Sequence, residues 1–268
     1  GREDWWNEEA TLERIARVAD MASRHGLALF PMLYAGHGAA NRAGIVLPPA
    51  RSEEGQSSTA ICPVAQTLWD EYLFRQAEAF ARVSDSHPVD GVLLELEIYA
   101  GKDAAGSGYW RKHCCCDRCL EEFLGKPAEP EIAAAPRAWL EREGRWEDFT
   151  RHQEDLAFRR VTDWRKRLQA INGKLRFGFY AFLALEDAWR IRQVAKALYD
   201  GGAPLLYLDS STYYETNSLR SPDPSRGRVA MWEWADYERA NFKKLGVEAD
   251  ICFGCYPESA RANYSMKE

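Results

Sequence analysis

Apolar residues are arranged along most of the chain in two alternating patterns. Short runs that are almost continuously apolar predict buried strands, at residues 26–35, 90–99, 174–182, 204–209 and 250–255. Between these runs, apolar positions three and four residues apart predict helices, at residues 8–25, 63–84, 135–171, 186–199 and 235–245. A shorter run at residues 228–233 predicts a sixth strand. Because strands separated by helices pair in parallel, the pattern predicts an α/β fold.

The order of these elements favours a TIM-type (β/α) barrel. Such barrels run to this length as one domain, so we expect residues 1–268 to form a single barrel domain. A closed barrel has eight strands and this chain opens on a helical pattern, so we expect an incomplete barrel whose first strands belong to a longer parent chain. An open doubly wound sheet is the alternative, although no Gly-rich phosphate-binding turn follows a predicted strand.

Composition narrows the classes of partner. A net charge of -6 and a pI near 5.6 argue against nucleic acid, whose binders carry a basic excess. No apolar run approaches the roughly 20 residues of a membrane span, and no leader pattern precedes the first helix. We therefore expect a soluble protein, and its compartment and oligomeric state stay open. The 10 Trp and 12 Tyr residues exceed what a core needs, and flat aromatic faces are typical of carbohydrate-binding clefts.

Two carboxylates lie on the predicted strand at residues 90–99. Alternation places Glu95, Glu97 and Tyr99 on one face of that strand. A buried carboxylate is costly unless it is paired or opens to a ligand. Either Arg176 pairs with Glu95 inside the fold, or the carboxylates line a site at the carboxyl end of the strand, where barrel enzymes bind substrate.

Four of the seven cysteines are crowded between residues 114 and 119. Cys114, Cys116 and Cys119 form C-x-C-x-x-C, a spacing that suits zinc with a fourth ligand from elsewhere. The pair Cys252 and Cys255 offers one way to complete a four-thiolate site with Cys116 and Cys119. Such a site would be structural, because four thiolates leave no open position for water. Cysteines that pack as small apolar residues without a metal are the alternative.

The sequence LEIYAG at residues 96–101, followed by HCCCDRCLEEF at residues 113–123, resembles the zinc-cluster β-galactosidases and related glycoside-hydrolase-like barrels. In that family Asn-Glu-Tyr-Gly at the end of the fourth strand precedes Cys-x-Cys-x-x-Cys and a Phe. The resemblance covers roughly residues 91–123 and the general layout. It implies that Glu97 is the general acid/base. Leu96 stands where the family has an Asn that contacts the sugar 2-hydroxyl.

The same resemblance implies a structural zinc ion and no cofactor for catalysis. By analogy the fourth ligand is Cys62, in the upstream sequence ICP, so that the metal ligands would be Cys62, Cys114, Cys116 and Cys119. His113 and Cys115 are further candidates in the same segment.

Hydrolysis of a glycosidic bond by this chemistry needs a second carboxylate from another strand. Glu233, in AMWEW, would lie at the end of a seventh strand, where the resemblance places the nucleophile. Glu258, Asp209 and Glu215 compete with it. Glu233 can also begin a helix, where the helix dipole favours an acidic residue.

Other residues at predicted strand ends are candidates for binding sugar. They are Glu95, Tyr99, Tyr34, His37, Trp110, Asp209, Tyr213, Trp232 and Glu258, with Trp234 and Tyr214 as further stacking surfaces. No H-E-x-x-H, G-x-S-x-G or Walker-type loop occurs, so zinc-protease, serine-hydrolase and nucleotide-dependent functions find no support.

The sequence therefore predicts a glycoside hydrolase that acts on carbohydrate by a two-carboxylate mechanism. A non-catalytic barrel that binds carbohydrate or protein is the main alternative, suggested by Leu96. A barrel lyase or hydrolase acting on a non-sugar substrate is a third hypothesis.

Overall fold

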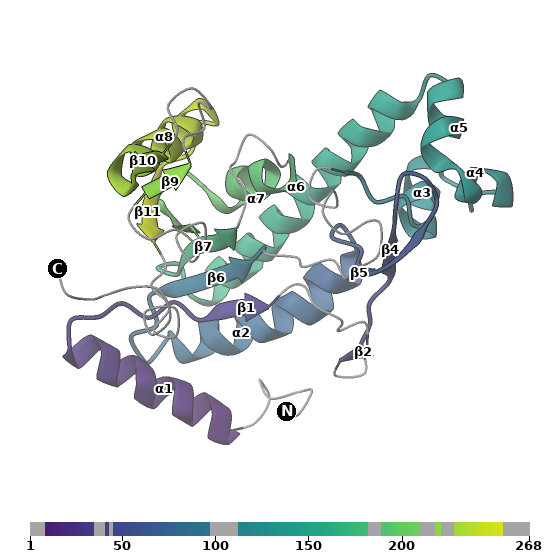
Figure 1. Cartoon of the computed structure of the whole chain (residues 1–268). Helices are drawn as coiled ribbons and strands as arrows, with labels where there is room; N and C mark the ends of the chain where they lie inside the picture. Colours follow the sequence, from purple (N-terminus) through teal and green to yellow (C-terminus); the bar gives the residue numbers. More distant parts are fainter. Residues whose placement is uncertain are drawn as a thin grey trace, which may run out of the picture.

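A five-stranded parallel sheet forms the centre of the computed structural model, which describes residues 9–34, 41–42, 45–96, 112–181, 189–209, 218–220 and 228–253 (Figure 1). Its strands are β1 (Met32–Tyr34), β6 (Gly91–Glu95), β7 (Arg176–Ala181), β8 (Leu205–Asp209) and β11 (Ala249–Phe253). They are hydrogen-bonded in the order β1-β6-β7-β8-β11, and every pair is parallel. The predicted α/β fold with a parallel sheet is thus confirmed.

Helices connect these strands. They are α1 (Glu9–Arg24), the π-helix η2 (Leu68–Leu73) that continues into α2 (Phe74–Val83), α3 (Asp117–Leu124), α4 (Pro130–Ala134), α5 (Pro136–Arg142), α6 (Trp146–Ile171), α7 (Trp189–Leu198) and α8 (Met231–Lys244). The helical pattern predicted over residues 135–171 is interrupted at Gly144. Its φ of 66° is a left-handed conformation that ends α5 and lets the chain turn into α6. None of the described helices is long and apolar enough to cross a membrane.

The sheet is wound in one direction, with its packed helices on one face. Strand order follows chain order, without the reversal that a doubly wound sheet has at its switch point. Trp164 of α6 packs edge-on against Phe177 of β7, with ring centroids 5.8 Å apart. Phe242 of α8 packs against Phe179 and Tyr207, at 6.2 and 5.2 Å. These strand residues alternate along β7 and β8, so they define one helix-covered face.

The opposite face carries a close approach between neighbouring strands. Leu93, Gly178 and Leu206 lie side by side in register on β6, β7 and β8. A Cβ on Gly178 would lie 2.2 Å from the carbonyl oxygen of Leu206 and 2.6 Å from a methyl carbon of Leu93. Only glycine fits at this position, because the leucines on both sides fill the space above it.

Three short antiparallel hairpins lie outside the sheet. They pair β2 (Asn41–Arg42) with β3 (Ile45–Val46), β4 (Pro49–Arg51) with β5 (Ser57–Ile61), and β9 (Ser218–Arg220) with β10 (Arg228–Ala230). The strand predicted at residues 228–233 is confirmed for Arg228–Ala230 alone, because helix α8 begins at Met231. Among the described residues β10 pairs antiparallel with β9, so it does not extend the parallel sheet. Ala235, Glu238 and Phe242 are buried at helical spacing, and a short apolar run cannot by itself distinguish a strand from such a helix.

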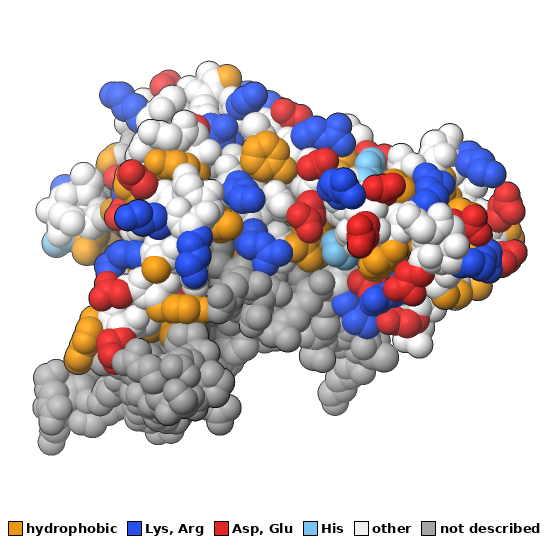
Figure 2. Space-filling view, turned by 90° about the horizontal axis from the view of Figure 1, so that it is seen from above, with side chains coloured by type: hydrophobic (Ala, Val, Ile, Leu, Met, Phe, Trp, Pro, Cys, Tyr) orange, Lys and Arg blue, Asp and Glu red, His pale blue; other side chains and the backbone are white. Residues whose placement is uncertain are grey.

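Charged side chains of both signs are interspersed over the described part of the face seen in Figure 2. Several form exposed ion pairs, such as Arg142 with Glu131 and Arg151 with Asp148. Exposed pairs of this kind contribute at most about 1 kcal/mol each. The stability of the fold therefore depends mainly on its apolar core and on the buried polar contacts described below.

We expect Gly178→Ala to lower the free energy of unfolding by about 1–3 kcal/mol, because the added methyl group must displace the Leu206 backbone. Urea denaturation followed by circular dichroism measures this loss. Gly173→Ala is the matched control, since the nearest atom to its Cβ is 3.8 Å away. Equal stabilities of the two variants would contradict the close approach.

Candidate metal centre and the carboxyl edge of the sheet

Four buried cysteines form one cluster. Cys62 follows β5, Cys114 and Cys116 precede α3, and Cys119 lies in the first turn of α3. Their Sγ atoms all lie within 4.8 Å of one another. The sulfur of Cys119 is 3.5 Å from that of Cys62 and 3.6 Å from that of Cys116. The cluster thus contains the three cysteines of the C-x-C-x-x-C motif and Cys62, which the family resemblance implied.

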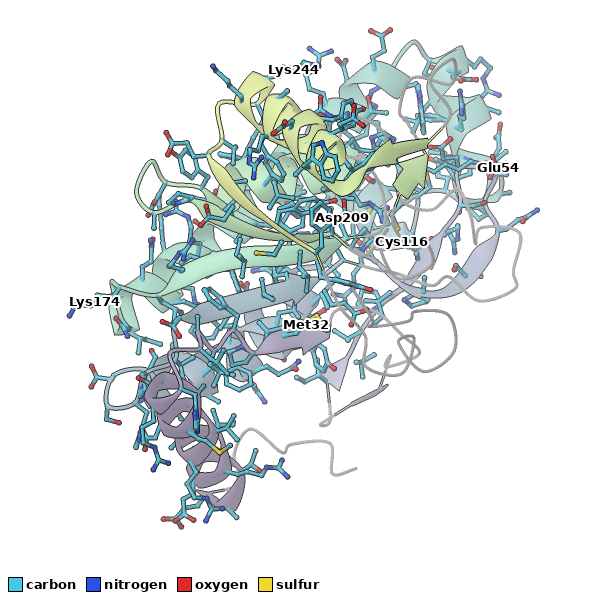
Figure 3. The ribbon with its side chains drawn as sticks, turned by 60° about the vertical axis from the view of Figure 1, so that its left-hand side comes forward. Met32, Glu54, Cys116, Lys174, Asp209 and Lys244 are labelled. Carbon is cyan, nitrogen blue, oxygen red and sulfur yellow. The ribbon has the colours of Figure 1, made fainter. Side chains whose placement is uncertain are left out.

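The geometry of the cluster fits zinc. Sulfur atoms about 2.3 Å from a central zinc ion lie about 3.8 Å from one another at the corners of a tetrahedron. The thiols of this cluster are already close to that arrangement, so they can hold a metal ion such as zinc. Four thiolates close its coordination sphere, and the ion would have a structural role. Figure 3 labels Cys116 at the cluster and Glu54 in the hairpin loop beside it.

The start of α3 positions two of the thiols. Cys116 is the N-cap residue, in an extended conformation with φ −67° and ψ 162°, and its carbonyl accepts the backbone N–H of Leu120 at 3.0 Å. Cys119 lies three residues further on, so both sulfur atoms lie at the same end of the helix. The partial positive charge at a helix N-terminus stabilises thiolates. The C-x-x-C spacing therefore gives two metal ligands from one turn.

Hydrogen bonding among the thiols concentrates negative charge on Cys114. Bonds from the thiols of Cys116, Cys119 and Cys62 lower its pKa well below the usual range, and the backbone N–H of Arg51 adds to the effect. The pKa values of Cys62 and Cys119 are raised, chiefly by their hydrogen bonds to Cys114. The hydrogen bond with Cys114 raises the pKa of Cys116, but the hydrogen bonds with Cys119 and Cys62 outweigh it, so this pKa is lowered as well. A cation at the centre of the cluster would replace these shared protons with four metal–sulfur bonds.

Glu53 joins the hairpin of β4 and β5 to the cysteine segment. Its buried carboxylate accepts the backbone N–H of His113 at 2.9 Å and a guanidinium N–H of Arg137 at 2.8 Å. Burial alone raises the pKa of Glu53, but the hydrogen bonds from His113 and Arg137 outweigh it and lower the pKa to about 2. Glu53 is therefore ionised at neutral pH and ties three separate parts of the chain together.

Helices α6 and α7 hold the same segment from the other side. The amide of Gln153, which is completely buried, accepts the N–H of Cys114 at 3.1 Å and donates to its carbonyl oxygen. The ring of His113 stacks on Trp189, with centroids 4.7 Å apart and planes 7° from parallel, and meets Trp146 edge-on. The cysteine segment is thus fixed by hydrogen bonds and ring contacts in addition to any metal.

At the carboxyl edge of the sheet, one residue from each strand lies in a single row. The register places Tyr34, Glu95, Tyr180, Leu208 and Cys252 side by side across the five strands. Glu95 and Tyr180 are 6% and 3% exposed, so a carboxylate and a phenol are buried next to each other on the face opposite the helices. Cys252 belongs to this row, so it does not complete the cysteine cluster.

Arg176 is not the partner of Glu95. It lies at the other end of β7, in register with Gly91, and its guanidinium donates to Asp250 at 2.7 Å. The hypothesis that Arg176 pairs with Glu95 inside the fold is therefore wrong, because the two residues lie at opposite ends of neighbouring strands.

The structure separates the remaining candidate carboxylates. Glu233 lies in the first turn of α8, so its predicted place at a strand end is wrong. Asp209 ends β8 on the helix-covered face, where its carboxylate accepts the indole N–H of Trp234 at 2.5 Å. Asp209 and Glu95 therefore lie on opposite faces of the sheet. Trp232 is 73% exposed.

Several predicted residues lie outside the described part of the chain. They are Glu97, Tyr99, His37, Trp110, Tyr213, Tyr214, Glu215, Glu258 and Cys255. Of Tyr34 the structure describes only the backbone, which ends β1. Their candidate roles stay predictions.

Three residues of this region were not identified from the sequence. Tyr180 could have been found from the sequence, because side chains alternate between the two faces of β7 and this alternation puts Tyr180 on the same face of the sheet as Glu95. Glu53 and Gln153 carried no such signal, because an acidic loop residue and a helical glutamine are usually solvent-exposed.

Comparison with known proteins gives no match. No family model matches this chain, and the comparisons with curated proteins and with solved structures found no match. The comparisons therefore assign the chain to no family.

We expect the reduced protein to bind one zinc ion per chain, measured by elemental analysis after gel filtration. Cys119→Ser should weaken zinc binding by more than roughly 100-fold, because loss of a direct ligand exceeds the effect of losing an outer contact. Cys115→Ser is the matched control, since Cys115 is buried in the same segment but lies outside the cluster. Undiminished zinc binding by Cys119→Ser would contradict the assigned ligand set.

We expect Glu53→Gln to lower the free energy of unfolding at pH 7 by up to about 3 kcal/mol. The pKa of Glu53 is lowered from 4.5 to about 2, so its stabilising effect is complete above about pH 4.5 and is lost as the pH falls towards 2. Urea denaturation at about pH 3 should show that the difference in unfolding free energy between wild type and variant falls to roughly half of its value at pH 7, or less. Glu131→Gln, at an exposed ion pair, should change little at either pH.

Proposed function

We propose that this chain is part of a (β/α)-barrel glycoside hydrolase whose four-cysteine centre braces the segment after β6. The observation that carries the proposal is the position of Cys62 in the cluster. The resemblance implied that this distant cysteine completes the C-x-C-x-x-C motif. Spacing alone also allowed Cys252 and Cys255, so the gathering of Cys62 with Cys114, Cys116 and Cys119 supports the likeness to zinc-cluster barrels.

The winding of the sheet also supports the proposal. Five parallel strands in chain order, with the packed helices on one face, are what an arc of a (β/α) barrel presents. Barrel enzymes bind substrate at the carboxyl edge of their strands. The buried row of Glu95 and Tyr180 lies at this edge, on the face that would form the barrel interior.

The proposed chemistry uses two carboxylates. Glu97, two residues beyond Glu95 in the sequence, protonates the leaving oxygen of the glycosidic bond. Glu233 acts as nucleophile or activates water. Although Glu233 is helical, its neighbour Trp234 bonds Asp209 at the end of β8, so the start of α8 lies at the carboxyl edge.

Leu96 favours a second candidate, a barrel that binds carbohydrate without cleaving it. The side chain of Leu96 is 7% exposed and packs in the main apolar core, and its N–H donates to the carbonyl oxygen of Tyr180 at 2.8 Å. The position where the family has a sugar-contacting amide is therefore occupied by a packed apolar side chain.

We expect the zinc-loaded chain to hydrolyse at least one member of a panel of nitrophenyl glycosides. Glu97→Gln should lower kcat by roughly 100-fold or more, because it removes the proton donor, and should leave the melting temperature unchanged. Glu248→Gln is the control, since this exposed carboxylate precedes β11 at the opposite edge of the sheet. If calorimetry shows saccharide binding but no glycoside is hydrolysed, the non-catalytic binding barrel replaces the hydrolase as the proposed function.

A further inference from the structure

One cysteine of the cluster lies at a surface pocket. Of the four cysteines, only Cys116 lines the pocket formed by Pro48, Pro49, Ala50, Arg51, Ser57, Asp117 and Arg118. Cys116 is 6% exposed, whereas Cys114 is completely buried and Cys62 and Cys119 are 1% and 3% exposed. A small molecule in the pocket therefore reaches the cluster at Cys116 first.

We propose that Cys116 is the oxidation site of the metal centre. Hydrogen peroxide that enters the pocket oxidises Cys116, Cys119 then forms a disulfide with it, and a metal ion held by the cluster would be released. This inference depends on the metal centre and is independent of the proposed hydrolase activity.

The surroundings of Cys116 suit the departure of an anionic oxygen from a peroxide. Cys116 caps the N-terminus of α3, and Arg51 and Arg118 line the same pocket. Helix N-termini and nearby cations stabilise the negative charge that develops on the leaving oxygen as the O–O bond breaks. Arg51 also pairs with Asp117, which fixes one wall of the pocket against the helix.

The reaction balances with the peroxide as the only oxidant. The Cys116 thiolate attacks one peroxide oxygen, the O–O bond breaks, and the products are a sulfenic acid and hydroxide. The Cys119 thiolate attacks the sulfenic sulfur and expels a second hydroxide as the S–S bond forms. Two protons from solvent convert both hydroxides to water. Two electrons pass from sulfur to peroxide, and the metal keeps only two of its four thiolate ligands.

Geometry selects Cys119 as the second partner. Its sulfur lies 3.6 Å from that of Cys116, and both are at the same end of α3. Cys62 is equally close to Cys119, at 3.5 Å, but it does not line the pocket and is not the first thiol oxidised. Cys115 is also excluded as the first site, because it is completely buried and does not line the pocket.

Release of the metal has a local structural consequence. The disulfide joins the N-cap residue of α3 to the first turn of the same helix. It removes the metal-mediated link between Cys62, which follows β5, and the start of α3. The contacts of Glu53 and Gln153 with residues 113–114 do not involve the metal, so the segment loosens without unfolding. Reduction and added zinc should therefore restore the centre.

The experiment treats the zinc-loaded full chain with increasing hydrogen peroxide. A chromogenic chelator measures the released zinc, and peptide mass spectrometry after thiol blocking locates the disulfide. We expect one zinc ion per chain to be released in step with a Cys116–Cys119 disulfide, and dithiothreitol with zinc to reverse both changes. Zinc that stays bound while Cys252 is oxidised, or a first disulfide between another pair of cysteines, overturns the proposal.

A pocket-filling variant tests the route of entry. Ser57 lines the pocket from β5, and Ser57→Phe should slow zinc release several-fold without changing the rate of Cys252 alkylation. Ser23→Phe, on α1, is the control and should release zinc at the wild-type rate. Both variants are first shown to bind one zinc ion. An unchanged release rate in Ser57→Phe overturns the assignment of the pocket as the route.

Discussion

The convergence of four buried thiols is the interaction on which this part of the molecule depends. Within 4.8 Å of one another and almost without solvent, they cannot all be ionised unless a cation balances them. Their shared hydrogen bonds lower the pKa of Cys114, and a metal ion would stabilise all four thiolates. The cysteines belong to the same apolar core as the strands and helices, so the cluster is continuous with the packing of the sheet.

The cluster joins parts of the chain that are far apart in sequence. Cys62 comes from the hairpin region between β1 and η2, whereas the other three cysteines follow β6. Figure 1 shows β4 and β5 beside α3, α4 and α5, at one end of the molecule. Gly55, with φ 87°, lets the hairpin tip approach α4, because a Cβ there would lie 2.3 Å from the carbonyl oxygen of Ala134. The four cysteines, Glu53 and this close approach therefore act on the same interface.

The cysteine cluster and the end of β6 are linked by a short stretch of sequence. Strand β6 ends at Glu95, and the residues that lead into the cluster are held at His113 by the carboxylate of Glu53. Under the proposed function, the general acid is Glu97, two residues after Glu95 in the sequence. Catalytic groups need support that limits their freedom, and a structural metal beside a rigid sheet is one way to supply it.

The sequence by itself determined the features that depend on local spacing. The alternation of apolar runs and helical periodicity was sufficient for the parallel α/β fold, and C-x-C-x-x-C predicted three thiols of one four-thiolate site. Spacing could not decide between Cys62 and the pair Cys252 and Cys255, nor place Glu233 in a helix. Those outcomes depended on which distant segments pack together, because burial and strand register are set by contacts between residues far apart in the chain. The role of Glu53 has the same origin: only the folded chain brings His113 and Arg137 to its carboxylate.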